Sequence, residues 1–226
     1  MKEGYKSTIE FWQKVFAQKE ELTKGRDYRK EINVIDLEKG IQWISSGSEK
    51  ILDYGCGNGA MIQRALAYGV DKIYGIDICE NAIRQAINVV KEYHLEDKSS
   101  FQIGGVEALQ KIQDCEFDGV ILSNIIDNMI PEDSLRVLDE VARILKPSGK
   151  LLLKINPYIE EEKRIEWKFE ELEEEFYKET TGLYLWNLTE EKINKILDEK
   201  FIIEERIEVY YEEHDMSNRM YYVRKK

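Results

Sequence analysis

The sequence contains little cysteine or proline, and it has no long hydrophobic run. Its three cysteines form no CxxC pair, which argues against a zinc site or a disulfide framework and favours a reducing compartment. Three prolines and 14 glycines exclude a collagen-like or low-complexity chain. No run approaches the ~20 apolar residues of a membrane span, and the N-terminus lacks a signal-peptide core. We therefore expect a cytoplasmic protein with no metal and no membrane partner.

Positive charge is also scarce. The 33 basic residues stand against 45 acidic ones, which gives a formal net charge of −12. Most of such a surface would repel a phosphate backbone, so we expect no nucleic-acid partner. The compact basic cluster Lys24, Arg26, Arg29 and Lys30 is diluted by neighbouring acids. A protein partner stays open because an acidic surface can recruit a basic one.

The middle of the chain alternates short apolar runs with segments of helical periodicity. We expect strands at 50–54, 72–78, 101–103, 117–122 and 150–155. One connecting helix covers 107–112, and another begins at Pro131 and ends before 146–149. That second helix places Leu135, Leu138, Val141, Ala142 and Leu145 on one side. The alternation predicts right-handed crossovers and a parallel, doubly wound sheet.

The last third of the chain has a different pattern. Thr189 can cap a helix that carries Ile193, Ile196 and Leu197. Two β-rich runs, 201–211 and 220–224, follow with no helix between them, so we expect an antiparallel pair. The predicted fold is therefore α/β, with a Rossmann-like seven-stranded sheet that is mostly parallel and has an antiparallel C-terminal strand pair.

We expect one domain with four parts. These are an N-terminal helical cover or lid (1–46), a ligand-binding α/β core (47–156), an acidic and aromatic insertion (157–188), and a C-terminal part (189–226) that completes the same sheet. Spacing in the insertion fits both a helix and a strand, so its conformation stays open. Its aromatic side chains fit packing or an acceptor pocket, and the acidic run at 170–175 fits a solvated face.

The most informative segment is ILDYGCGNGA, residues 51–60. Gly55, Gly57 and Gly59 permit backbone conformations and a close ligand approach that side chains would block. On spacing alone, the segment also satisfies the dinucleotide-binding fingerprint. Asp53 would repel a pyrophosphate but attract an amino group. This acid therefore favours a ligand that is cationic near the turn.

From about Phe11 to the C-terminus, these ordered motifs resemble the class I methyltransferases that use S-adenosyl-L-methionine (SAM) and release S-adenosyl-L-homocysteine. The resemblance implies that the Asp53–Gly59 turn holds the methionyl group and that Asp77 grips both ribose hydroxyls. Gly105 stands where the family often has an adenine-binding Asp. That contact then falls to the backbone of Gly105 and Val106, or to Glu107. The implied cofactor-binding residues are Asp53, Gly55, Cys56, Gly57, Gly59, Asp77, Ile78, Gly105, Val106, Glu107, Ser123 and Asn124.

The resemblance also implies in-line displacement of a methyl group onto a small-molecule acceptor. Asp127 and Asn128 follow the fourth strand and are candidates to hold or deprotonate this acceptor; helix-entry polarity is the alternative. A protein that binds SAM without transferring its methyl group stays open. A nicotinamide-dependent oxidoreductase is disfavoured by Asp53 and by the antiparallel strand pair.

The N-terminal segment carries Phe11, Val15 and Leu22 at spacings that place one helical face on the core. Tyr5 and Trp12 are left to point elsewhere. In families that resemble this one, such a segment closes over the cofactor. We hypothesise that Tyr5 and Trp12 border the SAM pocket and that the segment becomes ordered on cofactor binding. A permanently packed cover is the alternative.

Overall fold

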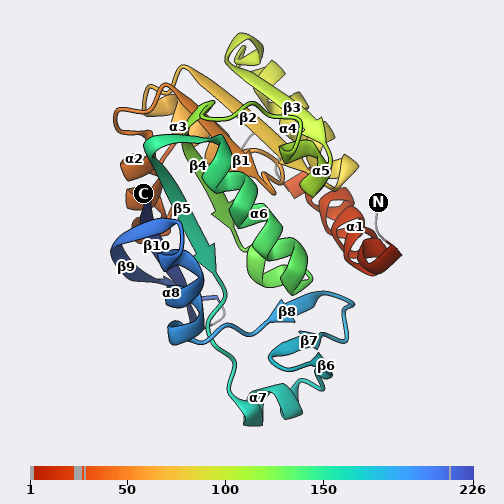
Figure 1. Cartoon of the computed structure of the whole chain (residues 1–226). Coiled ribbons are helices and arrows are strands. Elements are labelled where there is room, and N and C mark those ends of the chain that lie inside the picture. The colour runs from red at the N-terminus through yellow and green to blue at the C-terminus, as the bar shows by residue number, and fades with distance from the viewer. Residues whose placement is uncertain (1–2, 23–26, 28, 214) are drawn as a thin grey trace.

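A computed structural model of the chain describes residues 3–22, 27, 29–213 and 215–226, with backbone alone at residues 3 and 19–22. The strands of its main sheet are β1 (Lys50–Tyr54), β2 (Lys72–Asp77), β3 (Ser99–Ile103), β4 (Phe117–Ser123), β5 (Leu145–Ile155), β9 (Phe201–Tyr211) and β10 (Met216–Lys225). Their order in the sheet is β3-β2-β1-β4-β5-β10-β9 (Figure 1).

The first five strands of this sheet run parallel, whereas β10 is antiparallel to both β5 and β9. The predicted seven-stranded sheet, mostly parallel with an antiparallel C-terminal pair, is therefore confirmed. β10 is longer than the predicted 220–224 because it pairs with β9 from Met216 to Lys225.

Helices cover both faces of the sheet (Figure 1). One face packs against α2 (Ile35–Ser45), α3 (Ala60–Ala67) and α4 (Glu80–Glu92), and the other against α5 (Val106–Leu109), α6 (Pro131–Ile144) and α8 (Glu190–Asp198). Successive strand residues serve opposite faces, as strand geometry requires. Ile51, for example, belongs to the α2–α3–α4 side and Leu52 to the other. The structure also has three short 3-10 helices, η1 (Glu3–Tyr5), η2 (Glu96–Lys98) and η3 (Ile126–Asn128).

The buried side of α6 differs from the predicted one. Leu135 is 42% exposed, whereas Ser134 is fully buried and its hydroxyl donates a hydrogen bond to the Ile126 carbonyl (2.6 Å). Leu145 opens β5 instead of closing the helix, and the residues predicted as a loop at 146–149 lie within that strand. A hydrophobic pattern could not reveal Ser134 because its burial depends on this hydrogen bond.

The insertion combines a short helix with a small sheet. Helix α7 (Glu161–Glu166) is followed by β6 (Glu170–Glu173), β7 (Phe176–Lys178) and β8 (Tyr184–Trp186), which pair antiparallel in that order. The unit extends beyond the end of the main sheet (Figure 1). Every residue of β6 is exposed, which confirms the predicted solvated face there, whereas Glu175 forms an ion pair with Lys192.

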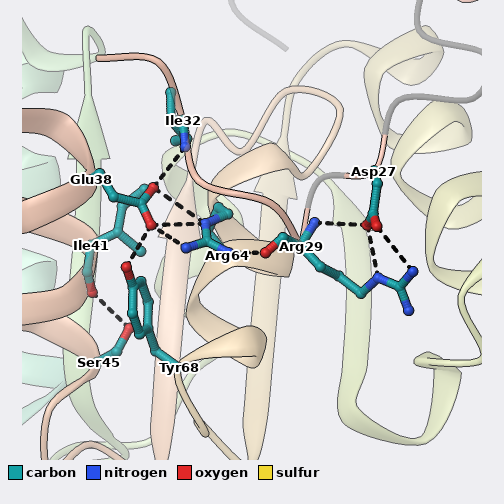
Figure 2. A network of polar contacts seen from close by, with 8 residues as sticks. All are labelled: Asp27, Arg29, Ile32, Glu38, Ile41, Ser45, Arg64 and Tyr68. Atoms are coloured by element: carbon teal, nitrogen blue, oxygen red, sulfur yellow. Dashed lines mark hydrogen bonds and ion pairs between the residues drawn. The ribbon is translucent and has the colours of Figure 1, made fainter. Parts of the chain in front are cut away.

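A buried ion pair joins α2 to α3 and also contacts Arg29 and Ile32, which come after α1 (Lys6–Leu22) in the chain. The guanidinium of Arg64 donates to the Glu38 carboxylate and to the Arg29 carbonyl, and the Ile32 N–H also donates to Glu38 (3.0 Å; Figure 2). Burial opposes ionisation of Glu38, but hydrogen bonds from Arg64, Tyr68 and Ile32 outweigh it and lower the pKa. Arg29 and Ile32 are thus held on α2 and α3.

Within the described part of the chain, no helix combines the length and apolar composition that a membrane crossing requires.

Candidate functional site

A cavity of about 360 Å³ lies between the carboxyl ends of β1 to β4 and the N-terminal helix α1. Carboxyl ends of parallel strands are the usual ligand-binding edge of such sheets. Residues from the first four strand ends line it: Tyr54, Gly55, Gly57, Asp77, Ile78, Gly104, Gly105, Val106, Glu107, Gln110, Ser123, Asn124 and Ile125. The N-terminal segment adds Tyr5, Thr8, Trp12 and Phe16, and the η3–α6 region adds Asn128, Met129, Asp133 and Arg136.

The glycine turn after β1 forms one wall of this cavity. Gly55 and Gly57 have φ values of +78° and +53°, which L side chains rarely adopt. A Cβ at Gly55 would lie 2.0 Å from Cδ1 of Ile125, so the close packing there excludes any side chain. Two other predicted residues of the turn, Cys56 and Gly59, do not line the cavity: Cys56 is buried, and Gly59 caps α3.

Asp77 lies at the cavity wall and is fixed by backbone donors. Its Oδ2 accepts a hydrogen bond from the Gly57 N–H (2.8 Å) and its Oδ1 from the Cys79 N–H (2.8 Å). Burial raises the pKa of this carboxyl, and the backbone donors partly offset that effect. The carboxylate is therefore held in one orientation, with lone pairs left for a ligand.

Asp53 is placed differently from our expectation, because it does not line the cavity and is only 2% exposed. Alternation along β1 turns its side chain to the opposite face from Tyr54, which does line the cavity. Burial, followed by the charge of Asp77, raises the pKa of Asp53 to about 8. Asp53 is therefore not placed to meet a cationic ligand group, and the acid that lines the cavity beside the glycine turn is Asp77.

At the end of β3, Gly105 stands at the position where the family that this chain resembles often has an adenine-binding aspartate. The Gly105 N–H donates to Oε1 of Glu107 (3.2 Å), so this carboxylate folds back on its own loop. Gly105, Val106 and Glu107 all line the cavity, as does Ile78 after β2.

The end of β4 brings Ser123, Asn124 and Asn128 to the cavity, but it does not bring Asp127. Asp127 is 2% exposed, and its Oδ2 accepts a hydrogen bond from the Asn156 N–H (2.7 Å). Burial raises its pKa to about 6. Of the two catalytic candidates, only Asn128 can meet a ligand in this cavity, and Asp127 instead orients Asn156.

The N-terminal helix covers the cavity with a stripe different from the predicted one. Tyr5, Thr8, Trp12 and Phe16 face the cavity at helical spacing. Phe11 and Val15 are only partly buried and belong to neither main core cluster, and the side chain of Leu22 lies outside the described ones. Tyr5 and Trp12 do border the cavity. Among the described residues, the buried hydroxyl of Thr8 has no hydrogen-bond partner, so a polar ligand atom could satisfy it.

Several lining residues were missed by the sequence analysis: Thr8, Phe16, Tyr54, Gly104, Gln110, Ile125, Met129, Asp133 and Arg136. The helical spacing of Tyr5, Thr8, Trp12 and Phe16 is a signal that could have identified this stripe. The aromatic residues of the insertion do not line this cavity. Tyr184 instead donates a hydrogen bond to the Gly4 carbonyl (2.7 Å) and so supports the start of the covering helix.

Residues 45–201 match the profile of a family described as a methyltransferase domain. Three curated relatives show its range. A ribosomal protein L11 methyltransferase of Desulfotalea psychrophila is 32% identical over 107 residues, 47% of this chain and 33% of that protein. A tRNA N(3)-methylcytidine methyltransferase of Schizosaccharomyces pombe is 26% identical over 166 residues, 70% and 53% respectively. A ubiquinone biosynthesis O-methyltransferase of Dechloromonas aromatica is 30% identical over 125 residues, 54% and 51%.

The chain thus spans about half or less of the length of these relatives. Two solved structures share its fold. Magnesium protoporphyrin IX methyltransferase from Synechocystis, with bound SAM, has a TM-score of 0.68 at 16% identity. The alignment covers 100% of this chain and 99% of that one. The N-methyltransferase NodS from Bradyrhizobium japonicum, with bound S-adenosyl-L-homocysteine, has a TM-score of 0.68 at 16% identity and covers 97% and 98%. From its motifs, its sheet and the family match together, the chain belongs to the class I SAM-dependent methyltransferase family.

Proposed function

We propose that this protein transfers the methyl group of SAM to a small-molecule acceptor by in-line displacement. The observation that carries the proposal is the cavity itself: the ends of β1 to β4 and the covering helix bring together most of the residues that the family resemblance named. When bound there, SAM supplies a methyl group already activated by its sulfonium cation.

The residues of the chain would bind and orient this cofactor. Asp77, held by the Gly57 and Cys79 N–H groups, has the acceptor oxygens that two ribose hydroxyls need. Three carboxyl side chains line the cavity, Asp77, Glu107 and Asp133, against one guanidinium, that of Arg136, and this balance favours a cationic ligand. Gly105, Val106 and Glu107 would meet the adenine, and Ser123 and Asn124 the methionyl part.

The covering helix would exclude water from the reacting groups. Tyr5, Trp12 and Phe16 present aromatic surface to the cavity, and Thr8 offers its unpaired hydroxyl. A closed, ordered site supplies much of the acceleration in such a displacement, because alignment replaces a bimolecular encounter. A base is required only if the acceptor carries a proton at neutral pH.

The class of methyl acceptor differs among relatives, which are named for protein, tRNA and small-molecule substrates. Two features favour a small molecule. The net charge of −12 opposes docking of a nucleic acid, and helix α1 covers the cavity. Of the basic cluster at residues 24–30, Lys24 and Arg26 lie outside the described residues, and Arg29 is paired with Asp27 (2.7 Å).

Calorimetry with SAM, S-adenosyl-L-homocysteine and NADH tests the cofactor. NADH binding as tight as SAM binding would overturn the methyltransferase assignment. Incubation with methyl-labelled SAM and a panel of phenols, amines, carboxylates and tRNA tests the acceptor. Label on tRNA at physiological salt would contradict the small-molecule class, and SAM binding without transfer to any acceptor would favour a binding protein.

A further inference from the structure

A second hollow, of about 190 Å³, lies where the insertion meets the end of the main sheet. The sheet contributes Asn156, Tyr211 and Asn218 to its lining. The insertion contributes Trp167, Phe169 and Glu179. The hollow is therefore bounded by two amides and one aromatic ring on the sheet side and by two aromatic rings and a carboxyl on the insertion side.

One layer of asparagine side chains separates this hollow from the cofactor cavity. Asn124 and Asn128 line the cavity, and Asn156 and Asn218 line the hollow. Asn124 Nδ2 donates to Asn156 Oδ1 (2.5 Å), and Asn218 Nδ2 donates to Asn124 Oδ1 (3.1 Å). A polar ligand group that replaces one of these hydrogen bonds would stand next to the cofactor cavity.

The cofactor cavity has room for a single ligand of moderate size. Its volume of about 360 Å³ lies at the low end of the ~300–1,000 Å³ that one drug-sized ligand occupies. An acceptor bound together with SAM needs further space, and the hollow behind the asparagine layer supplies it. At about 190 Å³, it fits a molecule smaller than the cofactor.

The lining of the hollow suits a cation attached to an aromatic ring. The amino group of Lys163 already lies 5.3 Å from the ring centre of Trp167, and that of Lys154 lies 5.3 Å from the ring centre of Tyr211. Each of these rings therefore already has a cation beside it, so the rings suit the aromatic part of a ligand and its positive charge falls to Glu179. Glu179 has no ion-pair partner among the described residues, and its carboxylate accepts only the Thr181 hydroxyl (2.9 Å).

Lys154 contacts one lining residue of each space, Asn124 of the cavity and Tyr211 of the hollow. Its amino group donates to Asn124 Oδ1, and Asn124 has the left-handed backbone conformation (φ +56°). Burial lowers the pKa of Lys154 to about 8, and the nearby Asp127 partly offsets this effect. Lys154 therefore acts as a positioning residue that holds Asn124 between cavity and hollow.

We propose that this hollow is the acceptor site and that it takes a small aromatic amine. The inference rests on the proposed function. The ring lies among Trp167, Phe169 and Tyr211, and the ammonium group meets Glu179. A second polar atom, the one methylated, replaces the hydrogen bond between Asn124 and Asn156 and so stands next to the methyl group in the cofactor cavity. A lone pair of that atom forms the new bond to the methyl carbon, the electron pair of the C–S bond returns to sulfur, and the proton of the acceptor atom leaves to water.

Three matched probes test the site: phenethylamine carries ring and amine, phenylacetate carries ring and carboxylate, and butylamine lacks the ring. The indole N–H signal of Trp167, assigned with Trp167→Phe, reports binding by NMR without any turnover. We expect phenethylamine to shift this signal at concentrations where the other two do not. Glu179→Gln should weaken phenethylamine binding about tenfold or more, since it removes a charge-assisted contact.

Glu173→Gln is the matched control, because this exposed residue of β6 belongs to the same insertion. Equal effects of the two substitutions, or equal shifts by phenylacetate, would overturn the acceptor-site inference. Calorimetry with SAM on the same samples separates the two proposals. SAM binding without amine discrimination contradicts the acceptor site alone, whereas amine binding without SAM binding contradicts the proposed function and the acceptor role with it.

Discussion

The hydroxyl of Tyr5 donates a hydrogen bond to Oδ2 of Asp133 (3.1 Å), 128 positions further along the chain. The same hydroxyl accepts one from the Ile130 N–H (3.0 Å). At the other side of the sheet, the Gln13 carbonyl accepts a hydrogen bond from Asn81 Nδ2 (3.0 Å). The N-terminal helix is thus attached to elements of both faces, α6 and α4, and spans the cavity between them.

Hydrogen exchange will show whether this helix is a lid or a fixed cover. We expect amides of residues 6–22 to exchange more slowly when SAM is added, because a ligand below the helix adds contacts that the free protein lacks. The amides of α8 are the internal reference, since that helix lies away from the cavity lining. Equal protection of residues 6–22 with and without SAM would make the helix scaffold.

Asp77→Ala should weaken SAM binding by ~1.5–3 kcal/mol, the range for hydrogen bonds to charged groups. Isothermal titration calorimetry measures the change directly. Asp71→Ala is the control, because this exposed acid lies just before β2 and outside the cavity. An unchanged affinity in Asp77→Ala would mean that the ribose is held elsewhere.

Thr8→Val should weaken SAM binding without lowering the stability of the fold. Valine keeps the shape of the side chain and removes a buried hydroxyl that has no partner among the described residues, so we expect an equal or higher midpoint of unfolding. SAM affinity should fall by ~0.5–1.5 kcal/mol if a ligand atom satisfies this hydroxyl. Ser7→Ala should lower the midpoint of unfolding and leave SAM affinity unchanged, because it removes a hydrogen bond to the Gly182 carbonyl outside the cavity. Unaltered SAM affinity in Thr8→Val argues against the role assigned to Thr8.

Asp53 should make stability depend on pH. Its pKa is about 8 in the folded protein, against an ordinary value of 3.8, so folding takes up a proton between these pH values. The contribution of Asp53 to the free energy of unfolding is therefore fully present below pH 4 and is lost as the pH rises toward 8. Asp53→Asn stays neutral and should raise the melting temperature at pH 8 but hardly at pH 4. Thermal unfolding at pH 4, 6 and 8 measures this, and a gain independent of pH would refute it.

Glu38→Ala should be among the most destabilising substitutions in α2. It leaves the buried guanidinium of Arg64 without its carboxylate, a loss that typically costs about 3–5 kcal/mol (Figure 2). Asp36→Ala removes an exposed pair with Lys39 in the same helix and should cost at most about 1 kcal/mol. Urea unfolding compares them, and similar losses would mean that the buried pair contributes little.

The fold could be predicted from the sequence because strands covered on both faces are apolar throughout. This pattern identified β1, β2 and β4 to within a residue of their observed bounds, whereas β9, a largely exposed edge strand, was identified from its β-rich composition. The errors occurred where polar residues are buried or where pairing continues into a polar segment. Ser134 replaced Leu135 on the core side of α6, and β10 extended to Met216 because β9 supplies backbone partners there.

The site was predictable where a local motif carries it. The glycine turn and Asp77 lie close together along the chain, and both line the cavity. Asp133 was missed because its contact with Tyr5 joins residues far apart in sequence, which no local motif records. Asp127 was expected at the cavity because it is a polar residue after a strand. Its side chain instead turns inward and accepts a hydrogen bond from the Asn156 N–H.

The place of β10 in the sheet has a consequence for biosynthesis. This strand lies between β5 and β9, yet the ribosome makes it after both. Until residues 216–225 have emerged, one edge of β5 is unpaired and β9 has no partner in the sheet. A nascent chain usually folds from its N-terminal part onward, so here the growing polypeptide carries an open, apolar strand edge from the synthesis of residue 155 until that of residues 216–225. That interval is where a chaperone would be needed most.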